Sequence, residues 1–232
     1  MRPLIQSREP IGLLFSGGVD SALLAWELRS RTGVVLSTMG RAGSPDLRAG
    51  EESAARVGLP WEKVALDESL VVRALDRFST ELEGLSSLSR SILLALAIAI
   101  EGATPQRLVC GQGVDELFLG YAHYRNLSEL GAARRSQEDL TRLRATDWPR
   151  TQRIAAGLGK EVVAPYLAPS FEAAATQVPI ALRLPDGLPK RFFREWAMSR
   201  GLPPELARRP KKALQYGSGL DALLRSLPRP GP

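Results

Sequence analysis

Cysteine and histidine are almost absent from this sequence, which contains one residue of each. The single cysteine, Cys110, excludes an internal disulfide framework and a zinc site made of several cysteines. Long hydrophobic runs are also missing, since the longest apolar stretch, residues 92–100, is far shorter than a membrane span of about 20 residues. The N-terminus shows no apolar segment with a cleavage site. We therefore expect a cytoplasmic protein with no membrane partner.

What remains is the composition of a globular protein, 232 residues long, 44% hydrophobic and 24% charged. This length predicts a single domain over residues 1–226, followed by a Pro-rich, disordered tail at residues 227–232. Within the domain we expect an α/β core at about residues 9–120. A helical, substrate-side part is expected at about residues 121–226.

Positive charge is concentrated in the second half of the chain. Residues 1–120 carry 12 Lys and Arg against 15 Asp and Glu, whereas residues 121–232 carry 19 against 10. Such asymmetry is found in proteins that bind nucleic acid. Arg-rich helices that surround a polyanionic nucleotide and are otherwise solvated would also explain it. Because no stripe of alternating aromatic and basic residues accompanies the charge, nucleic acid is kept as the minor alternative.

The chain is organised around residues 15–21, FSGGVDS. An apolar run at residues 11–15 predicts a short buried strand, and residues 22–28 predict a helix. At such a junction the helix N-terminus offers unpaired N–H groups, and glycines let the backbone approach an oxyanion closely. A phosphate-bearing ligand is therefore expected here. The residues predicted to bind it are Ser16, Gly17, Gly18, Asp20 and Ser21.

Asp20 narrows the choice of ligand. A Walker A loop would place a Lys before its Ser or Thr, and this loop has Asp20 there. A carboxylate beside phosphates is explained if it holds Mg²⁺, which prefers carboxylate and phosphate oxygens. The pattern SGGxDS resembles the PP-loop of the ATP pyrophosphatase superfamily, whose members cleave ATP between its α and β phosphates and hold the departing pyrophosphate. The alternative is a glycine-rich turn that binds no ligand.

Further strands and helices alternate along the first half of the chain. Strands are predicted at residues 34–39, 61–66 and 107–111. Helices are predicted at residues 45–56, 68–78 and 86–101, the first of them capped by Ser44. This alternation predicts a parallel sheet of four or five strands in an α/β sandwich of the PP-loop type. If the first and fourth strands are neighbours, residues 16–21 and 111–116 meet at the carboxyl edge of the sheet.

Residues 111–121, GQGVDELFLGY, supply the second motif. They resemble the GEGxDExFxGY segment in the synthetase domain of the asparagine synthetase family, which β-lactam synthetase and carbapenam synthetase share. The SPDL at residues 44–47 is similar to the segment after the second strand of that family. The resemblance runs from about residue 11 to about residue 220. The residues before it are too few for the family's N-terminal glutaminase domain, so we expect a stand-alone synthetase domain.

The resemblance implies roles for several residues. Asp115 would join Asp20 in binding Mg²⁺ together with the ATP phosphates, although an N-cap role would also explain Asp115. Residues 208–219, RRPKKALQYGSG, are similar to the family's closing loop, whose lysine stabilises charge on the α-phosphate and pyrophosphate. That role falls to Lys211, with Lys212 second, and a solvated basic turn is the alternative. The expected adenosine contacts are Leu14, Met39, Cys110 and Gly111.

Three positions depart from the family pattern. Gln112 stands where asparagine synthetase has Glu and β-lactam synthetase has Tyr, and an amide cannot act as an acid or base. It would instead hydrogen-bond a substrate, or the attacking group would need no base. In residues 159–168, Val163 replaces an Arg and Ala168 an Asp of the similar family segment. Glu161 is retained there, and it would serve as a base or pair with an arginine.

Residues 123–158 have an Arg-rich helical pattern, with an interruption expected at Trp148-Pro149. Asp147 and Arg150 resemble the DxxR of the family's helical region. His123 has no partner motif nearby, so a surface or packing role is expected for it.

The resemblance implies ATP-dependent adenylation of a carboxylate with release of pyrophosphate, followed by amide formation with release of AMP. ATP and Mg²⁺ are the expected cofactors. The expected partners are a small carboxylate and an amine or ammonia, the latter free or delivered by a separate glutaminase subunit. Two alternatives stay open. One is a tRNA-modifying PP-loop enzyme, and the other is a catalytically silent ATP-binding protein.

Overall fold

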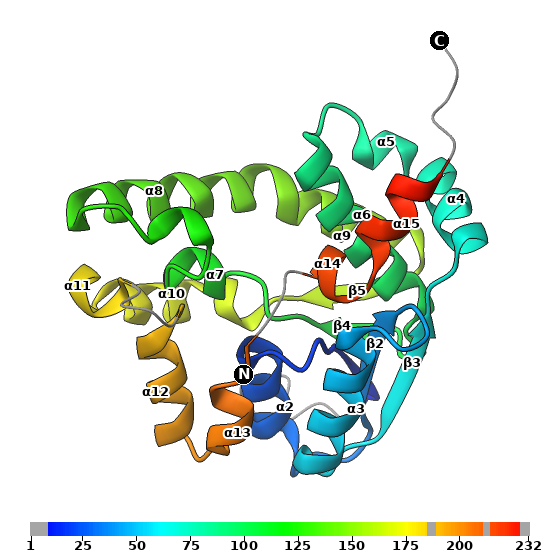
Figure 1. Cartoon of the computed structure of the whole chain (residues 1–232). Helices are drawn as coiled ribbons and strands as arrows, with labels where there is room; N and C mark the ends of the chain where they lie inside the picture. The colour runs from blue at the N-terminus through cyan, green and yellow to red at the C-terminus, as the bar shows by residue number, and fades with distance from the viewer. Residues whose placement is uncertain (1–8, 185–188, 211–213, 228–232) are drawn as a thin grey trace.

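The structure is a computed structural model that describes residues 9–184, 189–210 and 214–227. Its centre is a parallel sheet with the strand order β3-β2-β1-β4-β5 (Figure 1). The strands are β1 (Ile11–Leu14), β2 (Val34–Gly40), β3 (Trp61–Ala65), β4 (Arg107–Val109) and β5 (Glu161–Val163). The predicted parallel α/β sheet is therefore confirmed, including the pairing of β1 with β4.

β5 is the strand that was not expected. It contributes only three residues and pairs Val163 with Val109 at the edge of the sheet. Three residues are too few to show the period of a strand in a sequence. The strand order reverses at β1, whose neighbours are β2 and β4. In open α/β sheets, the crevice at such a reversal is where ligands bind, outside the carboxyl ends of the strands.

Helices cover both faces of the sheet (Figure 1). The first face is covered by α2 (Val19–Leu28), α3 (Pro45–Val57), α12 (Arg191–Ser199) and α13 (Pro204–Ala207). The second is covered by α4 (Glu68–Arg77), α5 (Ser79–Leu82), α6 (Ser87–Gly102), α9 (Trp148–Gly157), α14 (Leu214–Gly217) and α15 (Leu220–Ser226). Apolar side chains fill both interfaces, which is why the central strand β1 carries no polar side chain.

The remaining helices lie beyond the carboxyl edge of the sheet (Figure 1). They are α7 (Val114–Leu117), η1 (Ala122–Tyr124), α8 (Glu129–Arg142), η2 (Leu143–Asp147), η3 (Pro165–Leu167), α10 (Pro169–Thr176) and α11 (Ile180–Arg183). In the part of the chain that the structure describes, no helix is both long enough and apolar enough to cross a membrane.

The predicted helix starts agree with the structure. Ser44 caps α3 by accepting a hydrogen bond from the backbone N–H of Leu47, and Pro45 occupies the first turn. α3 ends at Gly58, whose φ of 77° is left-handed. Asp67 caps α4 in the same way as Ser44 caps α3.

The interruption expected at Trp148-Pro149 takes a different form. α8 continues through the π-helical turn η2 into α9 without leaving the helical path. Pro149 has no N–H to donate to the preceding turn, so the wider turn just before it accommodates the missing hydrogen bond. Of the predicted tail, Leu227 packs against the core beside α15, and residues 228–232 lie outside the described residues.

Candidate active site

The first motif lies between the carboxyl end of β1 and the N-terminus of α2. Gly17 has a left-handed φ of 68°, and a Cβ there would lie 2.7 Å from the backbone oxygen of Ala49, so this turn requires glycine. Ser16 is half-buried, whereas Ser21 is buried and donates its hydroxyl to the carbonyl oxygen of Gly18 at 3.1 Å. Among the described residues no side chain caps α2, which leaves its first N–H groups to a ligand or water.

The loop is fixed to its surroundings by buried hydrogen bonds. The hydroxyl of Thr38, on β2, donates to the carbonyl oxygen of Phe15 at 2.6 Å. The phenol of Tyr166, on η3, donates to the backbone oxygen of Asp20 at 2.9 Å. Tyr166 is buried, and its burial raises the pKa of the phenol well above its usual range. It therefore remains a donor that holds the start of α2 in place.

The second motif meets the first at the carboxyl edge of the sheet. A Cβ on Gly111, just after β4, would lie only 3.1 Å from Cβ of Asp20. Gly113 then turns the chain with a φ of 102°, so that α7 begins at Val114 and carries Asp115 in its first turn. The predicted meeting of residues 16–21 with residues 111–116 is thus seen in the structure.

Asp20 and Asp115 are joined by a lysine that was not predicted, Lys190. Its Nζ lies 2.6 Å from Oδ2 of Asp20 and 2.7 Å from Oδ1 of Asp115. The side chains of Lys190 and Asp20 are each 5% exposed, and that of Asp115 is 29% exposed. Burial lowers the pKa of the ammonium, but the charges of Asp115 and Asp20 outweigh this effect and raise the pKa above its usual value.

The backbone around Lys190 is held firmly. Lys190 itself has a left-handed φ of 60°, which is uncommon for a residue other than glycine. Arg194, buried in α12, donates its Nε to the carbonyl oxygen of Pro189 at 2.9 Å. Its Nη1 donates to the carbonyl oxygens of Ala207 and Arg209, at 2.5 and 3.1 Å. One guanidinium therefore joins the lysine-bearing end of α12 to the start of the predicted closing loop.

Gly120 makes room for the lysine. A Cβ at this position would lie 3.0 Å from Cγ of Asp115 and closer still to Oδ1 of Asp115 and Cε of Lys190. Gly120 is also fixed by a 2.8 Å hydrogen bond from its N–H to the carbonyl oxygen of Asp115. The third glycine of the GxGxDExFxGY pattern is explained by this close approach.

The two carboxylates suit a hard divalent cation. They converge on one point, which the ammonium nitrogen of Lys190 occupies, and both offer the oxygen ligands that Mg²⁺ prefers. Among the described residues no three His, Cys, Asp or Glu side chains gather to hold a metal. The remaining ligands of such an ion would have to be water and phosphate oxygens, as is usual for Mg²⁺ at nucleotide sites.

Glu116 is a second buried carboxyl beside the pair. It is 5% exposed and accepts a 2.6 Å hydrogen bond from the phenol of Tyr121. Burial, with repulsion from Asp115 as a smaller contribution, raises the pKa of Glu116 to about 7. Glu116 therefore adds less negative charge to the site at neutral pH than its residue type suggests.

The residues predicted to contact adenosine gather at the carboxyl ends of the first two strands and of β4. Leu14 ends β1 and is half-buried, and Met39 is the last residue but one of β2. Cys110 and Gly111 follow β4 directly. Burial raises the pKa of the Cys110 thiol to about 12, so this cysteine has the properties of a buried apolar side chain and not of a nucleophile.

Gln112 follows these residues in the loop after β4. Its amide oxygen Oε1 is buried, and it has no hydrogen-bond partner within the part of the chain that the structure describes. A buried acceptor without a partner is costly in a folded protein and is commonly resolved by a ligand or water. This is the property expected of a residue that hydrogen-bonds a substrate.

Glu161 is not brought to the same place. It opens β5 and pairs in register with Arg107, the first residue of β4, so it lies at the amino edge of the sheet. Its carboxylate is 56% exposed and lies 3.1 Å from Nε of Arg107. The structure therefore shows the salt bridge, which was the alternative for Glu161, and gives no support to a catalytic base there.

Lys211 and Lys212 lie outside the described residues, but the segments on both sides are described. Before them, Nη1 of Arg209 donates to Oγ of Ser53 and to the carbonyl oxygen of Ala49, at 2.8 and 3.0 Å. After them, a Cβ on Gly217 would lie 2.6 Å from Oδ2 of Asp46, in the SPDL segment. The closing-loop motif thus contacts α3 on both sides of the two lysines.

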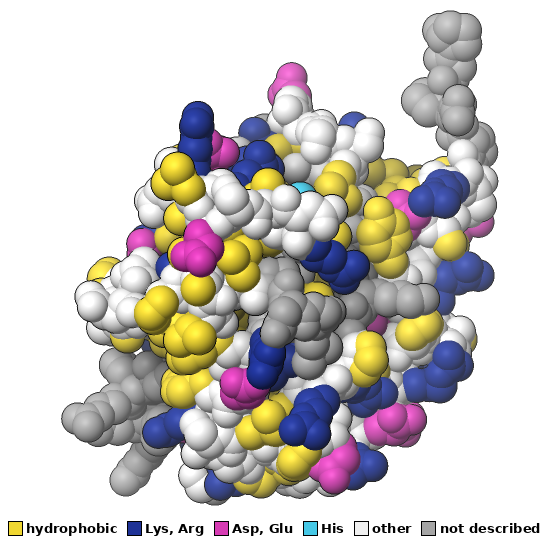
Figure 2. Space-filling view, turned by 60° about the vertical axis from the view of Figure 1, so that its left-hand side comes forward, with side chains coloured by type: hydrophobic (Ala, Val, Ile, Leu, Met, Phe, Trp, Pro, Cys, Tyr) yellow, Lys and Arg dark blue, Asp and Glu magenta, His cyan; other side chains and the backbone are white. Residues whose placement is uncertain are grey.

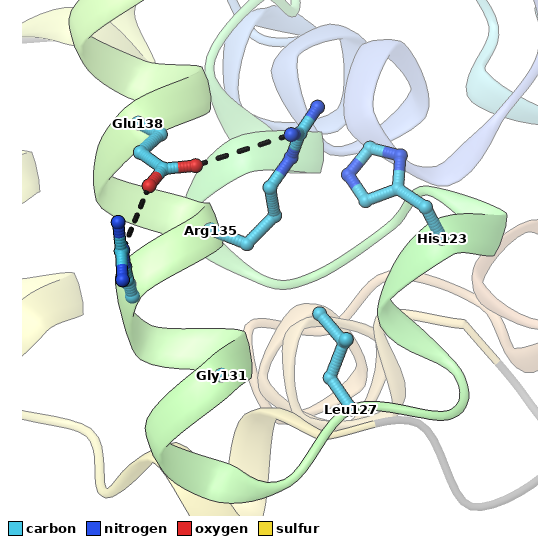
Figure 3. Close-up of a pocket in the computed structure, with 6 residues that line it drawn as sticks. His123, Leu127, Gly131, Arg135 and Glu138 are labelled. Carbon is cyan, nitrogen blue, oxygen red and sulfur yellow. Dashed lines mark hydrogen bonds and ion pairs between the residues drawn. The ribbon is translucent and has the colours of Figure 1, made fainter.

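The only histidine has a partner that the sequence did not indicate. Nε2 of His123 lies 2.8 Å from Oδ2 of the buried Asp139, which also accepts a 2.8 Å hydrogen bond from the phenol of Tyr124. Burial opposes ionisation of Asp139, but hydrogen bonds from Tyr124 and His123 and the charge of Arg135 prevail and lower its pKa. Figure 3 shows His123 and Arg135 at an open hollow of about 480 Å³ between η1 and α8.

Several arginines of the second half form ion pairs with acidic side chains. Those pairs include Arg134–Glu138, Arg135–Asp139, Arg142–Asp139, Arg144–Glu172, Arg191–Glu195, Arg200–Glu27, Arg209–Glu52 and Arg225–Asp221. On the face drawn in Figure 2, Lys and Arg are scattered among acidic, polar and apolar side chains. The arrangement favours solvated, ion-paired helices over a nucleic-acid surface on that face.

The fold and the site define an α/β protein in which two carboxylates converge at the carboxyl edge of a parallel sheet. Comparison with known proteins gives its family. The family model for asparagine synthase matches residues 2–135 and 127–228. The chain therefore belongs to the asparagine synthase family.

Individual relatives agree with this assignment. The chain is 29% identical over 231 residues to the glutamine-hydrolyzing asparagine synthetase of Gallus gallus, covering 94% of this chain and 41% of that enzyme. It is 31% identical over 221 residues to the enzyme of Rattus norvegicus, covering 89% and 39%. The chain thus spans less than half the length of these relatives.

A solved structure, a predicted subunit of a tRNA methyltransferase from Methanocaldococcus jannaschii, aligns with a TM-score of 0.42 and 18% identity, covering 88% of this chain and 94% of that one.

Proposed function

We propose that this chain catalyses ATP-dependent adenylation of a carboxylate, followed by formation of an amide. The observation that carries the proposal is the convergence of Asp20 and Asp115 beside an uncapped helix N-terminus, at the carboxyl edge of the sheet. This is the arrangement that a metal-bound polyphosphate requires. Membership of the asparagine synthase family supports the amide product.

In the proposed reaction, an oxygen of the substrate carboxylate attacks the α-phosphorus of ATP. The bond between the α-phosphorus and the oxygen that bridges to the β-phosphate breaks, and pyrophosphate leaves against the N–H groups of residues 16–21. Mg²⁺ held by Asp20 and Asp115 would neutralise charge on the phosphates. Lys211 is proposed to stabilise the charge that develops on the α-phosphate.

An amine or ammonia then attacks the acyl carbon, AMP leaves, and the nitrogen loses a proton. Gln112 cannot take that proton, but its buried oxygen, which has no partner among the described residues, can accept an N–H hydrogen bond from the attacking nitrogen. We therefore propose that Gln112 orients the nucleophile. The nitrogen's proton would pass to the AMP phosphate or to water.

The experiment is a pyrophosphate-release assay with ATP and Mg²⁺ over a panel of carboxylic acids, with and without ammonia. Wild type is compared with Asp20→Asn, Asp115→Asn and Lys211→Ala. Asp221→Asn is the matched control, because Asp221 pairs with Arg225 on α15. We expect release that depends on one class of carboxylate, falls at least 100-fold in the three variants and is unchanged in the control. Release that no carboxylate stimulates, or that Asp115→Asn leaves intact, would contradict the proposal.

A further inference from the structure

We propose that Lys190 is a built-in substitute for the divalent cation, and that its ammonium group and the metal are mutually exclusive occupants of the Asp20–Asp115 site. The proposal rests on the proposed function, because it concerns the same two carboxylates. It adds a step to that function: Lys190 must leave the pair before a metal can be held there. Free divalent cations would then bind weakly, and the metal would enter together with the nucleotide.

The distances place ammonium and metal in the same space. Nζ of Lys190 is 2.6 and 2.7 Å from the two carboxylate oxygens, whereas Mg²⁺ binds oxygen at 2.0–2.1 Å. An ion that touched both oxygens would therefore lie almost on top of Nζ. Two positive charges cannot share such a position in a buried site, where their repulsion is strong. One of them has to leave.

The charges of Asp20 and Asp115 explain why a cation lies between them. Two carboxylates that face each other in a buried site repel strongly unless a cation lies between them. Lys190 supplies one positive charge, which leaves the three groups with a net charge of −1. A divalent cation in place of Lys190 would bring the same position to neutrality. The site is therefore stabilised by either cation, and the divalent one suits it better once it arrives.

The fold directs this lysine to the pair and leaves it a way to move. Arg194 holds Pro189 by a hydrogen bond, and Lys190 has a left-handed backbone conformation. The surroundings therefore fix the backbone position from which the Lys190 side chain extends. Gly120 leaves space for the end of the lysine stem. The four-carbon side chain of Lys190 has rotatable bonds, which allow the ammonium to move away from the two carboxylates while the backbone stays fixed. The exchange is thus a side-chain movement.

The test measures divalent-cation binding without nucleotide, using Mn²⁺ and the electron paramagnetic resonance signal of the free ion. Wild type is compared with Lys190→Met and Lys190→Gln. The matched control is Lys160→Met, because Lys160 is half-buried and its Nζ donates to the backbone oxygens of Ile100 and Glu101 instead of to carboxylates. We expect Lys190→Met to bind one Mn²⁺ at least 10-fold more tightly than wild type and the control. Adding Asp115→Asn to Lys190→Met should remove that tight binding.

Two outcomes would overturn the proposal. One is equal Mn²⁺ affinity, within twofold, in wild type and both Lys190 variants. The other concerns a Lys190→Met protein that does not fold without metal. Millimolar Mn²⁺ should then restore its folding. If it does not, and Lys190→Gln binds Mn²⁺ no more tightly than wild type, the exchange of ammonium for metal is refuted. A lysine that only stabilised the fold would lower stability without creating a Mn²⁺ site. The Mn²⁺ test contains neither ATP nor a substrate carboxylate. It can therefore fail while the protein still releases pyrophosphate, and it can succeed while the protein releases none.

Discussion

Gly120→Ala should disturb the Asp115–Lys190 pair without removing any charged group. The added Cβ would lie 3.0 Å from Cγ of Asp115 and closer to Oδ1 of Asp115 and Cε of Lys190. Both side chains are held by each other, and Lys190 also by Asp20, so neither can yield without weakening the pair. Overpacking of a well-filled site costs about 1–3 kcal/mol.

We expect Gly120→Ala to lose about 2 kcal/mol of unfolding free energy. For a chain of this size, 1 kcal/mol shifts the melting temperature by roughly 2–4 °C, so a drop of about 4–8 °C is predicted. The assay is thermal unfolding followed by circular dichroism, with urea unfolding as the second measurement. The same variant should weaken pyrophosphate release, because Asp115 is displaced from its position.

Gly157→Ala is the matched control. Gly157 ends α9 and its φ is not left-handed. Outside its chain neighbours and its own helix turn, no described residue has an atom within 4 Å of a Cβ built there. An alanine in a helix is favoured over glycine by about 0.5–1 kcal/mol, so this variant should melt at or slightly above the wild-type temperature. A Gly120→Ala protein that is as stable as wild type would refute the reasoning about the close approach.

Three further predictions concern single residues. Arg194→Lys should lose about 2–3 kcal/mol in urea unfolding, since one ammonium cannot replace a guanidinium that binds three carbonyl oxygens, while the exposed Arg200→Lys should lose less than about 1 kcal/mol. The pKa of Asp139 is lower in the folded than in the unfolded protein. The stability that Asp139 contributes is therefore present above its unfolded pKa of about 3.9 and is lost as the pH falls through the folded pKa. Urea unfolding at several pH values should show that wild type loses its advantage over Asp139→Asn below about pH 4. Cys110 should not react with a thiol reagent in the folded protein and should react fully in urea, because burial raises its pKa to about 12.

Much of the sheet was predictable because its strands carry signals that act locally. β1 and β2 are rich in apolar and β-branched residues, glycine or proline residues stand near the strands, and α3 has its cap and its terminating glycine in the sequence. The meeting of the two motifs also followed, since the carboxyl ends of neighbouring parallel strands share one edge. Local chemistry and one topological rule were sufficient for these features.

Lys190 could not be found in that way. It lies 170 residues from Asp20, in a segment with no pattern that distinguishes it from other basic segments. A general argument predicts only that a cation lies near the two carboxylates, because their negative charges must be compensated in a buried site. With 19 Lys and Arg in residues 121–232, the sequence could not say which one supplies it.

Glu161 was misplaced for a different reason, because β5, the strand that it opens, has only three residues and shows no strand period in the sequence. Once that strand is known, the position of Glu161 follows. The motif that contains it begins a strand, and Glu161 is the first residue of that strand. In a parallel sheet the first residues of the strands lie at the amino edge, away from a site at the carboxyl edge. The direction of the strand therefore argues against Glu161 as a base, whatever its resemblance to a family position.

The central claim is that a substrate carboxylate attacks the α-phosphorus of ATP. The most direct test uses a carboxylate substrate labelled with ¹⁸O on both oxygens, incubated with the protein, ATP, Mg²⁺ and ammonia. If the acyl-adenylate forms and is then opened at its acyl carbon, one ¹⁸O from the carboxylate must appear in AMP, which mass spectrometry detects. Label in AMP is the result we predict. Label in inorganic phosphate with ADP as the other product, or turnover to AMP that carries no label, would contradict adenylation.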